Sequence, residues 1–180
     1  MKKIILASSI LAVASFAQLS QAAPVTGNIN FTGTLTTATC ALDGGDDVAV
    51  PMGLVPFQDI DVSDLSAITP QGEAKLVVSC ADAAGITSID LKLSPTPDIN
   101  PILVKLAAGG ATGAGIALLN ADNTIRDLSI DANRTLNETL VKTGDDGVAT
   151  FNLKAAYVKN TDPAVGGDAN AVLPFVLDYQ

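Results

Sequence analysis

Polar and apolar residues alternate strictly along residues 25–36. Every second position is apolar or glycine, namely Val25, Gly27, Ile29, Phe31, Gly33 and Leu35. The residues between them are all threonine or asparagine. Because the side chains of a strand point alternately to its two faces, this pattern predicts a strand with one apolar face and one polar face. The glycines on the apolar face indicate positions where another backbone comes close.

The alternation changes phase directly after this segment. Two polar threonines follow Leu35, and the next apolar side chains, Ala38, Cys40 and Leu42, occupy even positions. A shift of one residue turns the apolar set of a strand to the opposite face. Residues 25–35 are therefore not a simple continuation of the strand that carries Cys40. They form either an ordinary first strand of a sandwich or an arm whose apolar face is buried in something else.

Short period-two segments continue along the rest of the chain. The clearest predicted strands are residues 73–80, 88–93, 150–157 and 171–179. A hairpin is expected from residues 116–119 and 125–130, and a short strand from residues 48–50; residues 109–115 read as a glycine-rich loop, 58–70 as irregular and 135–143 as ambiguous. No segment after residue 22 carries a long apolar stripe of helical period. Many short strands at regular spacing predict an all-β sandwich.

The first 22 residues have the features of a signal peptide. Lys2 and Lys3 precede a mostly apolar run, and Ser20-Gln21-Ala22 fits a small-x-small cleavage site. Cleavage after Ala22 shortens the chain from 180 to 158 residues, which suffices for one domain with a sizeable core. No later apolar stretch is long enough to span a membrane, so we expect a soluble mature protein.

The mature chain is strongly acidic. Its 10 basic residues fall to 8 when Lys2 and Lys3 are removed, against 19 acidic residues, which gives a net charge of −11. Such a surface repels phosphate backbones, so nucleic acid is not an expected partner. Export also places the two cysteines, Cys40 and Cys80, in an oxidising compartment, where an intramolecular disulfide is the expected state.

The composition offers little to catalysis. The chain has no histidine, which excludes Ser-His-Asp and Cys-His mechanisms and the usual zinc sites. Neighbouring carboxylates such as Asp145 and Asp146 lie in a glycine-rich turn, where acidic residues are normally solvated. The segment Asp43-Gly44-Gly45-Asp46-Asp47 lacks the ligand series of an EF-hand loop. We therefore expect no enzyme activity, no metal site and no cofactor.

Taken together, these features resemble the type 1 pilin family, the structural subunits of bacterial chaperone–usher fimbriae. The likeness covers residues 23–180. It rests on the signal peptide followed by an alternating arm that contains Gly33, on two cysteines forty residues apart, and on the segment from Ala111 to Leu119. Its most specific part is the C-terminus, where Gly167 is fourteenth from the end, Leu173, Phe175 and Leu177 alternate, and Tyr179 is penultimate.

The resemblance implies an incomplete immunoglobulin-like sandwich that lacks its last strand. Residues 23–36 would be the donor-strand extension and residues 37–180 the pilin domain. A periplasmic chaperone would first fill the open groove, an outer-membrane usher would export the subunit, and the arm of another subunit would fill the groove in the surface fimbria, which supports cell adhesion. The expected chaperone-recognition residues are Gly167, Leu173, Phe175, Leu177 and Tyr179.

Three other interpretations remain at this point, of which a secreted hydrolase is the most distant. The first is a monomeric secreted β-sandwich that binds a ligand or carbohydrate, with residues 25–35 folded into its own sheet. The second is the receptor-binding tip subunit of a fimbria. Adhesins of the family carry a binding domain before the pilin domain, and 158 residues leave no room for it.

Overall fold

The computed structural model describes residues 39–45, 47–62 and 66–180. The predicted signal peptide and the predicted donor residues, Val25, Gly27, Ile29, Phe31, Gly33 and Leu35, lie outside this part of the chain. The domain boundaries at residues 22 and 36 therefore stay predictions.

The larger sheet is built around one long strand, β8 (Asp146–Lys159). On one side β8 pairs antiparallel with β3 (Gly72–Ala81), which in turn pairs with β1 (Thr39–Leu42). Three shorter strands also pair with β8: β2 (Asp61–Val62), β5 (Ala114–Leu119) and β7 (Val141–Thr143). The β2 pairing is parallel, whereas the others are antiparallel.

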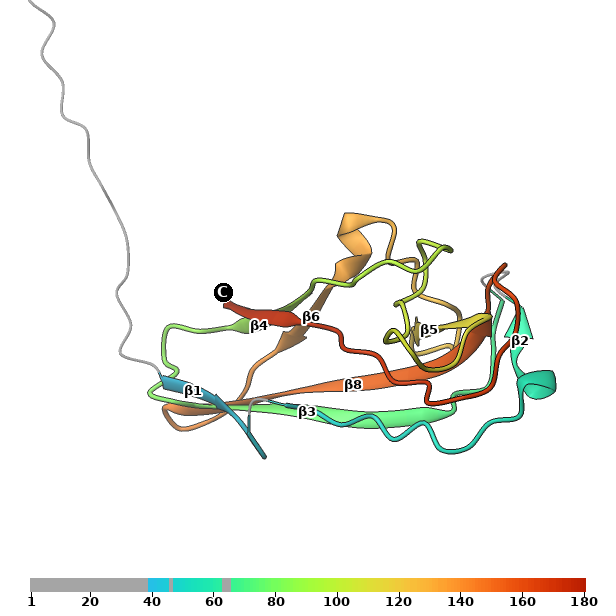
Figure 1. The fold of residues 1–180 in the computed structure, drawn as a ribbon. Coiled ribbons are helices and arrows are strands. Elements are labelled where there is room, and N and C mark those ends of the chain that lie inside the picture. The colour runs from blue at the N-terminus through green and yellow to red at the C-terminus, as the bar shows by residue number, and fades with distance from the viewer. Residues whose placement is uncertain (1–38, 46, 63–65) are drawn as a thin grey trace, which may run out of the picture. The chain divides into compact units, whose positions relative to one another are not determined.

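The smaller sheet contains β4 (Ser88–Leu93) between β6 (Thr135–Thr139) and β9 (Phe175–Tyr179). Figure 1 shows β4, β6 and β9 in one layer and β1, β3 and β8 in the other. The described residues include no α-helix, only two 3-10 turns at Phe57–Asp59 and Asp131–Arg134. None of these helices is long or apolar enough to cross a membrane. The predicted all-β sandwich is confirmed.

The core lies between the two sheets and follows the period-two pattern of the sequence. Leu76 of β3 and Phe151 of β8 face Ile89 and Leu91 of β4, and all four side chains are fully buried. Burying a side chain of this kind contributes about 1.5–3 kcal/mol of transfer free energy. Burial of these alternating apolar side chains is therefore the main force that holds the two sheets together.

A disulfide joins Cys40 and Cys80, as expected from the sequence. The two residues face each other directly across the pairing of β1 with β3. Cys80 is buried and belongs to the core between the sheets. The bond fixes β1 to the sheet at the point where the chain enters the described domain.

Several elements differ from the sequence prediction. Residues 48–50 form no strand, and the hairpin at 116–130 has only one bridge on its second arm, between Leu119 and Ile125. The ambiguous residues 135–143 form two strands, β6 and β7, which belong to different sheets. The last strand begins at Phe175 instead of residue 171, directly after Pro174.

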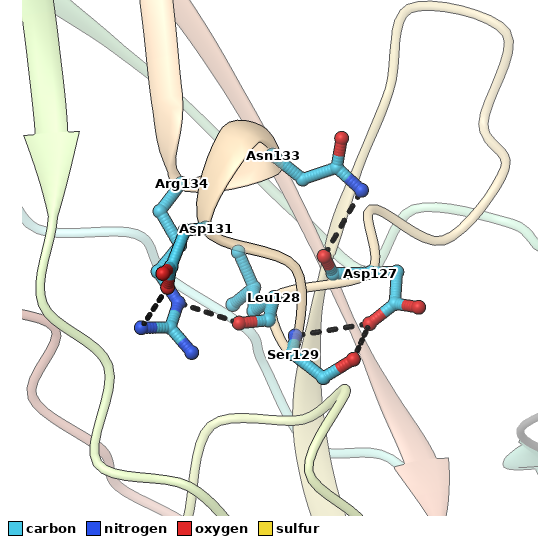
Figure 2. A network of polar contacts seen from close by, with 6 residues as sticks. All are labelled: Asp127, Leu128, Ser129, Asp131, Asn133 and Arg134. Atoms are coloured by element: carbon cyan, nitrogen blue, oxygen red, sulfur yellow. Dashed lines mark hydrogen bonds and ion pairs between the residues drawn. The ribbon is translucent and has the colours of Figure 1, made fainter.

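A polar loop at residues 127–134 leads into β6 (Figure 2). The Asp127 carboxylate accepts hydrogen bonds from the backbone N–H and the hydroxyl of Ser129, at 2.9 and 2.5 Å. Arg134 Nε donates to the Leu128 carbonyl at 2.6 Å, and Asn133 Nδ2 donates to the Asp127 carbonyl at 3.1 Å. The Leu128 side chain is fully buried, so local hydrogen bonds satisfy the loop while one residue anchors it to the core.

Candidate functional site

The last strand, β9, has one unpaired edge among the described residues. It pairs with β4 and with no other described strand. Gln180 exchanges hydrogen bonds with Ser88, and the Ser94 N–H donates to the Pro174 carbonyl at 2.8 Å. Hydrogen-bonded pairs alternate with non-hydrogen-bonded pairs in an antiparallel ladder. The backbone groups of the odd-numbered residues of β9 therefore point to the open edge, and these residues are Phe175, Leu177 and Tyr179.

Pro174 does not interrupt this edge. A proline lacks the N–H that a ladder uses, so its place in the alternation decides which neighbour loses a donor. Pro174 belongs to the even-numbered residues, whose backbone groups face β4. The missing donor is lost from the β4 side, and the groups that face the open edge stay available.

An extended segment, residues 47–53, lies across from β9 and pairs with no described strand. Val48, Val50 and Met52 are half-buried, whereas the residues between them are exposed. Half-buried and exposed side chains thus alternate along the segment, as in a strand. It lies close on β3, because a Cβ atom at Gly72 would lie 2.6 Å from Met52 Sδ and 2.9 Å from Val50 Cγ1. We call residues 47–53 the N-terminal wall and residues 168–175 the C-terminal wall.

A groove runs between the two walls and opens onto the core. Its first compartment has a volume of about 380 Å³. Leu76, Leu91 and Ile116 contribute to its floor, while Val50 and Phe175 line it from the two walls. No charged residue of the described part of the chain lines this compartment. An apolar concavity beside an open strand edge is suited to an apolar peptide in extended conformation.

A second compartment of about 460 Å³ adjoins the first. Four residues line both compartments: Gly53, Tyr157, Ala169 and Asn170. The buried side chains of Ile60, Leu106 and Ala114 contribute to the floor of the second one, and Asp168 is the one charged residue among its lining residues. The two compartments form one groove and meet at the four shared residues.

Comparison with known proteins bears directly on this arrangement. The sequence model of the family described as "Fimbrial protein" matches residues 29–180. The chain belongs to the fimbrial protein family. It is therefore a structural subunit of a fimbria, and its place is the fimbria at the cell surface. The resemblance to type 1 pilins noted in the sequence is confirmed.

The relatives of this fimbrial subunit match most or all of its length. The type-1 fimbrial protein subunit of Serratia marcescens is 27% identical over 187 residues and covers 100% of both chains. The uncharacterized fimbrial-like protein YcbU of Escherichia coli K12 is 34% identical over 149 residues, which is 77% of this chain and 79% of that protein. The crystal structure of the P pilus rod subunit PapA matches over 85% of this chain and 100% of that chain. The sequence identity is 21% and the TM-score is 0.41, so this similarity is distant.

The structure brings three of the five predicted C-terminal residues of the fimbrial subunit to the groove. Leu173 and Phe175 line the first compartment, and Gly167 lines the second. Leu177 is half-buried against the core, and Tyr179, 45% exposed, lies at the end of the same face of β9. Gly167 has a packing reason as well, because a Cβ atom there would lie 3.1 Å from the Ala111 nitrogen.

The sequence prediction missed the residues that shape the rest of the groove. Of the N-terminal wall, only residues 48–50 were predicted as a short strand, and Tyr157 was predicted as an ordinary strand residue. The alternation of Val48, Val50 and Met52 past Pro51 was the available signal for an extended wall. Nothing in the local sequence indicates that Tyr157 reaches Ala169.

Charged residues of the fimbrial subunit gather on the outer face of the smaller sheet, away from the groove. Lys92 Nζ and Asp178 Oδ2 form an ion pair at 2.5 Å between β4 and β9. The hydrogen bond and the charge of Asp178 raise the pKa of Lys92, and those of Lys92 lower the pKa of Asp178. Asp90 accepts hydrogen bonds from Asn137 and Gln180, so polar contacts tie β9 to β4. In the described part of the chain, no three His, Cys, Asp or Glu side chains gather closely enough to hold a metal ion.

Proposed function

We propose that this subunit polymerises head to tail, with residues 23–36 of one copy filling the groove of the next. The observation that carries the proposal is the open edge of β9 beside a groove whose first compartment is lined by no charged residue. Unpaired strand edges template association with other chains and have to be covered. Strand addition at such an edge is a known mode of recognition, and chaperone–pilin complexes are an established case of it.

The arm has the composition that this groove requires. Residues 25–35 carry no charge and alternate with period two, so one face suits an apolar concavity. Their backbone could pair with the groups that Phe175, Leu177 and Tyr179 direct to the open edge. The phase change after Leu35 supports an arm that belongs to another copy's sheet, because it separates the arm's apolar face from that of β1.

Filling the groove of a second copy produces a fibre. The arm and the groove are different surfaces of one chain, so the contact is heterologous, and heterologous contacts that do not close generate filaments. Before assembly the groove needs a temporary occupant. We assign this role to a strand of a periplasmic chaperone and the subsequent export to an outer-membrane usher, and we place chaperone recognition at Gly167, Leu173, Phe175, Leu177 and Tyr179.

Three variants test the proposal. Deleting residues 23–35 leaves a subunit that folds on its chaperone but cannot fill another groove. Moving the same segment behind Gln180 on a flexible linker gives a monomer that fills its own groove, because the effective concentration favours the intramolecular strand. Gly33→Leu slows or abolishes polymerisation, whereas Thr34→Ala, on the polar face beside it, does not.

The readouts are the polymer ladder on gels, size-exclusion chromatography and thermal unfolding of the chaperone-bound domain. A self-contained secreted sandwich predicts the opposite behaviour: the mature chain runs as a monomer, and the arm deletion unfolds it. That result would show that residues 25–35 are simply a first strand and would remove the proposal.

A further inference from the structure

Tyr157 lies where the two compartments of the groove meet. It belongs to β8, is 8% exposed, and is one of the four residues that line both compartments. Its ring packs in a small cluster with Ile60, Leu106 and Ala114. This burial raises the pKa of the phenol, so the hydroxyl stays protonated and able to donate well above neutral pH.

The hydroxyl of Tyr157 holds the C-terminal wall. It donates to the Ala169 carbonyl at 2.9 Å. The carbonyls on either side face the other way: Ala111 N–H donates to Asp168 and Ala107 N–H donates to Asn170, both at 2.8 Å. The carbonyls of residues 168, 169 and 170 are therefore all hydrogen-bonded, the middle one by Tyr157 and the outer two by backbone N–H groups of residues 107 and 111. Of the three donors, Tyr157 is the one that lines both compartments, whereas Ala111 lines only the second.

This arrangement opposes the natural tendency of an empty apolar groove. Apolar surface gains free energy when it leaves water, so an unattached wall would fold onto the floor. A buried phenol also needs a hydrogen-bond partner, which gives the contact with Ala169 a defined geometry. We propose, building on the function proposed above, that Tyr157 is a positioning residue that sets the distance between the C-terminal wall and the floor, and so keeps both compartments open to one continuous strand.

Tyr157→Phe is the direct test, because it keeps the ring and removes the hydroxyl. The matched control is Ser129→Ala, which removes a hydrogen-bonded hydroxyl from the loop of Figure 2, outside the groove. Both changes are made in the mature full-length chain. Polymer formation and uptake of a fluorescent peptide with the sequence of residues 23–36 are followed over time, and amide exchange is measured at Ala107 and Ala111.

The expected result for Tyr157→Phe is strand uptake slowed about three- to tenfold, the effect of one lost hydrogen bond on the barrier. Exchange at Ala107 and Ala111 becomes faster, while Ser129→Ala matches wild type in both measurements. Wild-type uptake and exchange in Tyr157→Phe overturn the inference. So does a failure of Tyr157→Phe to fold, because the residue is then a packing element. If the wild-type chain itself takes up no peptide and forms no polymer, the proposed function fails as well.

Discussion

The inner space of the sandwich has a closed part and an open part, built from the same kinds of residue. In the closed part, Phe151 of β8 is fully buried in one core cluster with Val78 and Ile89. In the open part, Phe175 of β9 is only half-buried, although it pairs with the buried Leu93 of β4 and packs against the same core. The difference lies in the surroundings: the Phe151 side chain is enclosed in the core between the sheets, whereas Phe175 lines the groove beside the open edge of β9. An alternating pattern identifies a face that must be buried but not the chain that buries it.

The two phenylalanines give the largest expected effect. Phe151→Ala should destabilise the refolded, unpolymerised subunit by about 3–5 kcal/mol, because it opens a cavity in a filled core. Phe175→Ala should cost less in that state, since its ring is already partly in water, and should instead weaken uptake of the arm peptide. Chemical denaturation and peptide titration of both variants check the contrast. If both variants lost the same amount of stability, Phe175 would be an ordinary core residue and would not line an open groove.

The disulfide stabilises the closed part by joining β1 to β3. Replacing Cys40 and Cys80 together by serine should cost about 4 kcal/mol, the chain-entropy value for a loop with a sequence separation of 40 residues. The expected phenotype is loss of the folded subunit from the periplasm. Mass spectrometry of wild-type periplasmic protein without reductant should find both thiols blocked, and two free thiols in a folded subunit would contradict this account.

The open part also depends on close backbone contacts. A Cβ atom at Gly110 would lie 2.0 Å from the carbonyl oxygen of Asp168, the first residue of the C-terminal wall. A Cβ atom at Gly85, outside the groove, would meet nothing within 4 Å. Gly110→Ala should therefore displace this wall, destabilise the subunit by about 1–3 kcal/mol and slow polymerisation. Gly85→Ala is the matched control and should behave as wild type. Similar polymerisation rates for the two variants would show that the wall position does not matter.

The outer face of β9 should matter least. The lowered pKa of Asp178 means that its pairing with Lys92 stabilises the fold above the ordinary aspartate pKa near 4 and is lost as the pH falls through the folded-state value. Both side chains are about half exposed, so solvent screens the pair. Asp178→Asn should leave thermal unfolding at pH 7 close to wild type and remove only a small part of the acid dependence. A large change in either would show that this ion pair governs the edge of the groove.

The sequence predicted those parts of the fold in which local pattern and partner coincide. Strands β3, β4 and β8 alternate against a permanent partner in the same chain, so their period was sufficient. Residues 135–143 stayed ambiguous because the chain passes from one sheet to the other at Leu140, where the alternation has no common face. The disulfide followed from export and from the presence of only two cysteines.

The groove could be predicted only in part. Leu173 and Phe175 were identified through the C-terminal resemblance, and both line it. The N-terminal wall alternates as a strand does, but pairing depends on a neighbour that local sequence does not reveal. The role of Tyr157 depends on a hydrogen bond to a residue in a different segment, and no periodicity encodes such a contact.

The central claim is that the arm of one copy lies in the groove of another, and cross-linking between copies tests it most directly. One variant carries Phe31→Cys in the arm, and a second carries Leu173→Cys in the groove. The two are refolded together, with the Cys40–Cys80 disulfide intact, and then oxidised. We predict cross-links between the two different chains, in species that run as polymers. A double variant that carries both Phe31→Cys and Leu173→Cys on one chain is oxidised in parallel. The account would be contradicted if the mixture gave no such cross-links while the double variant cross-linked within single monomeric chains.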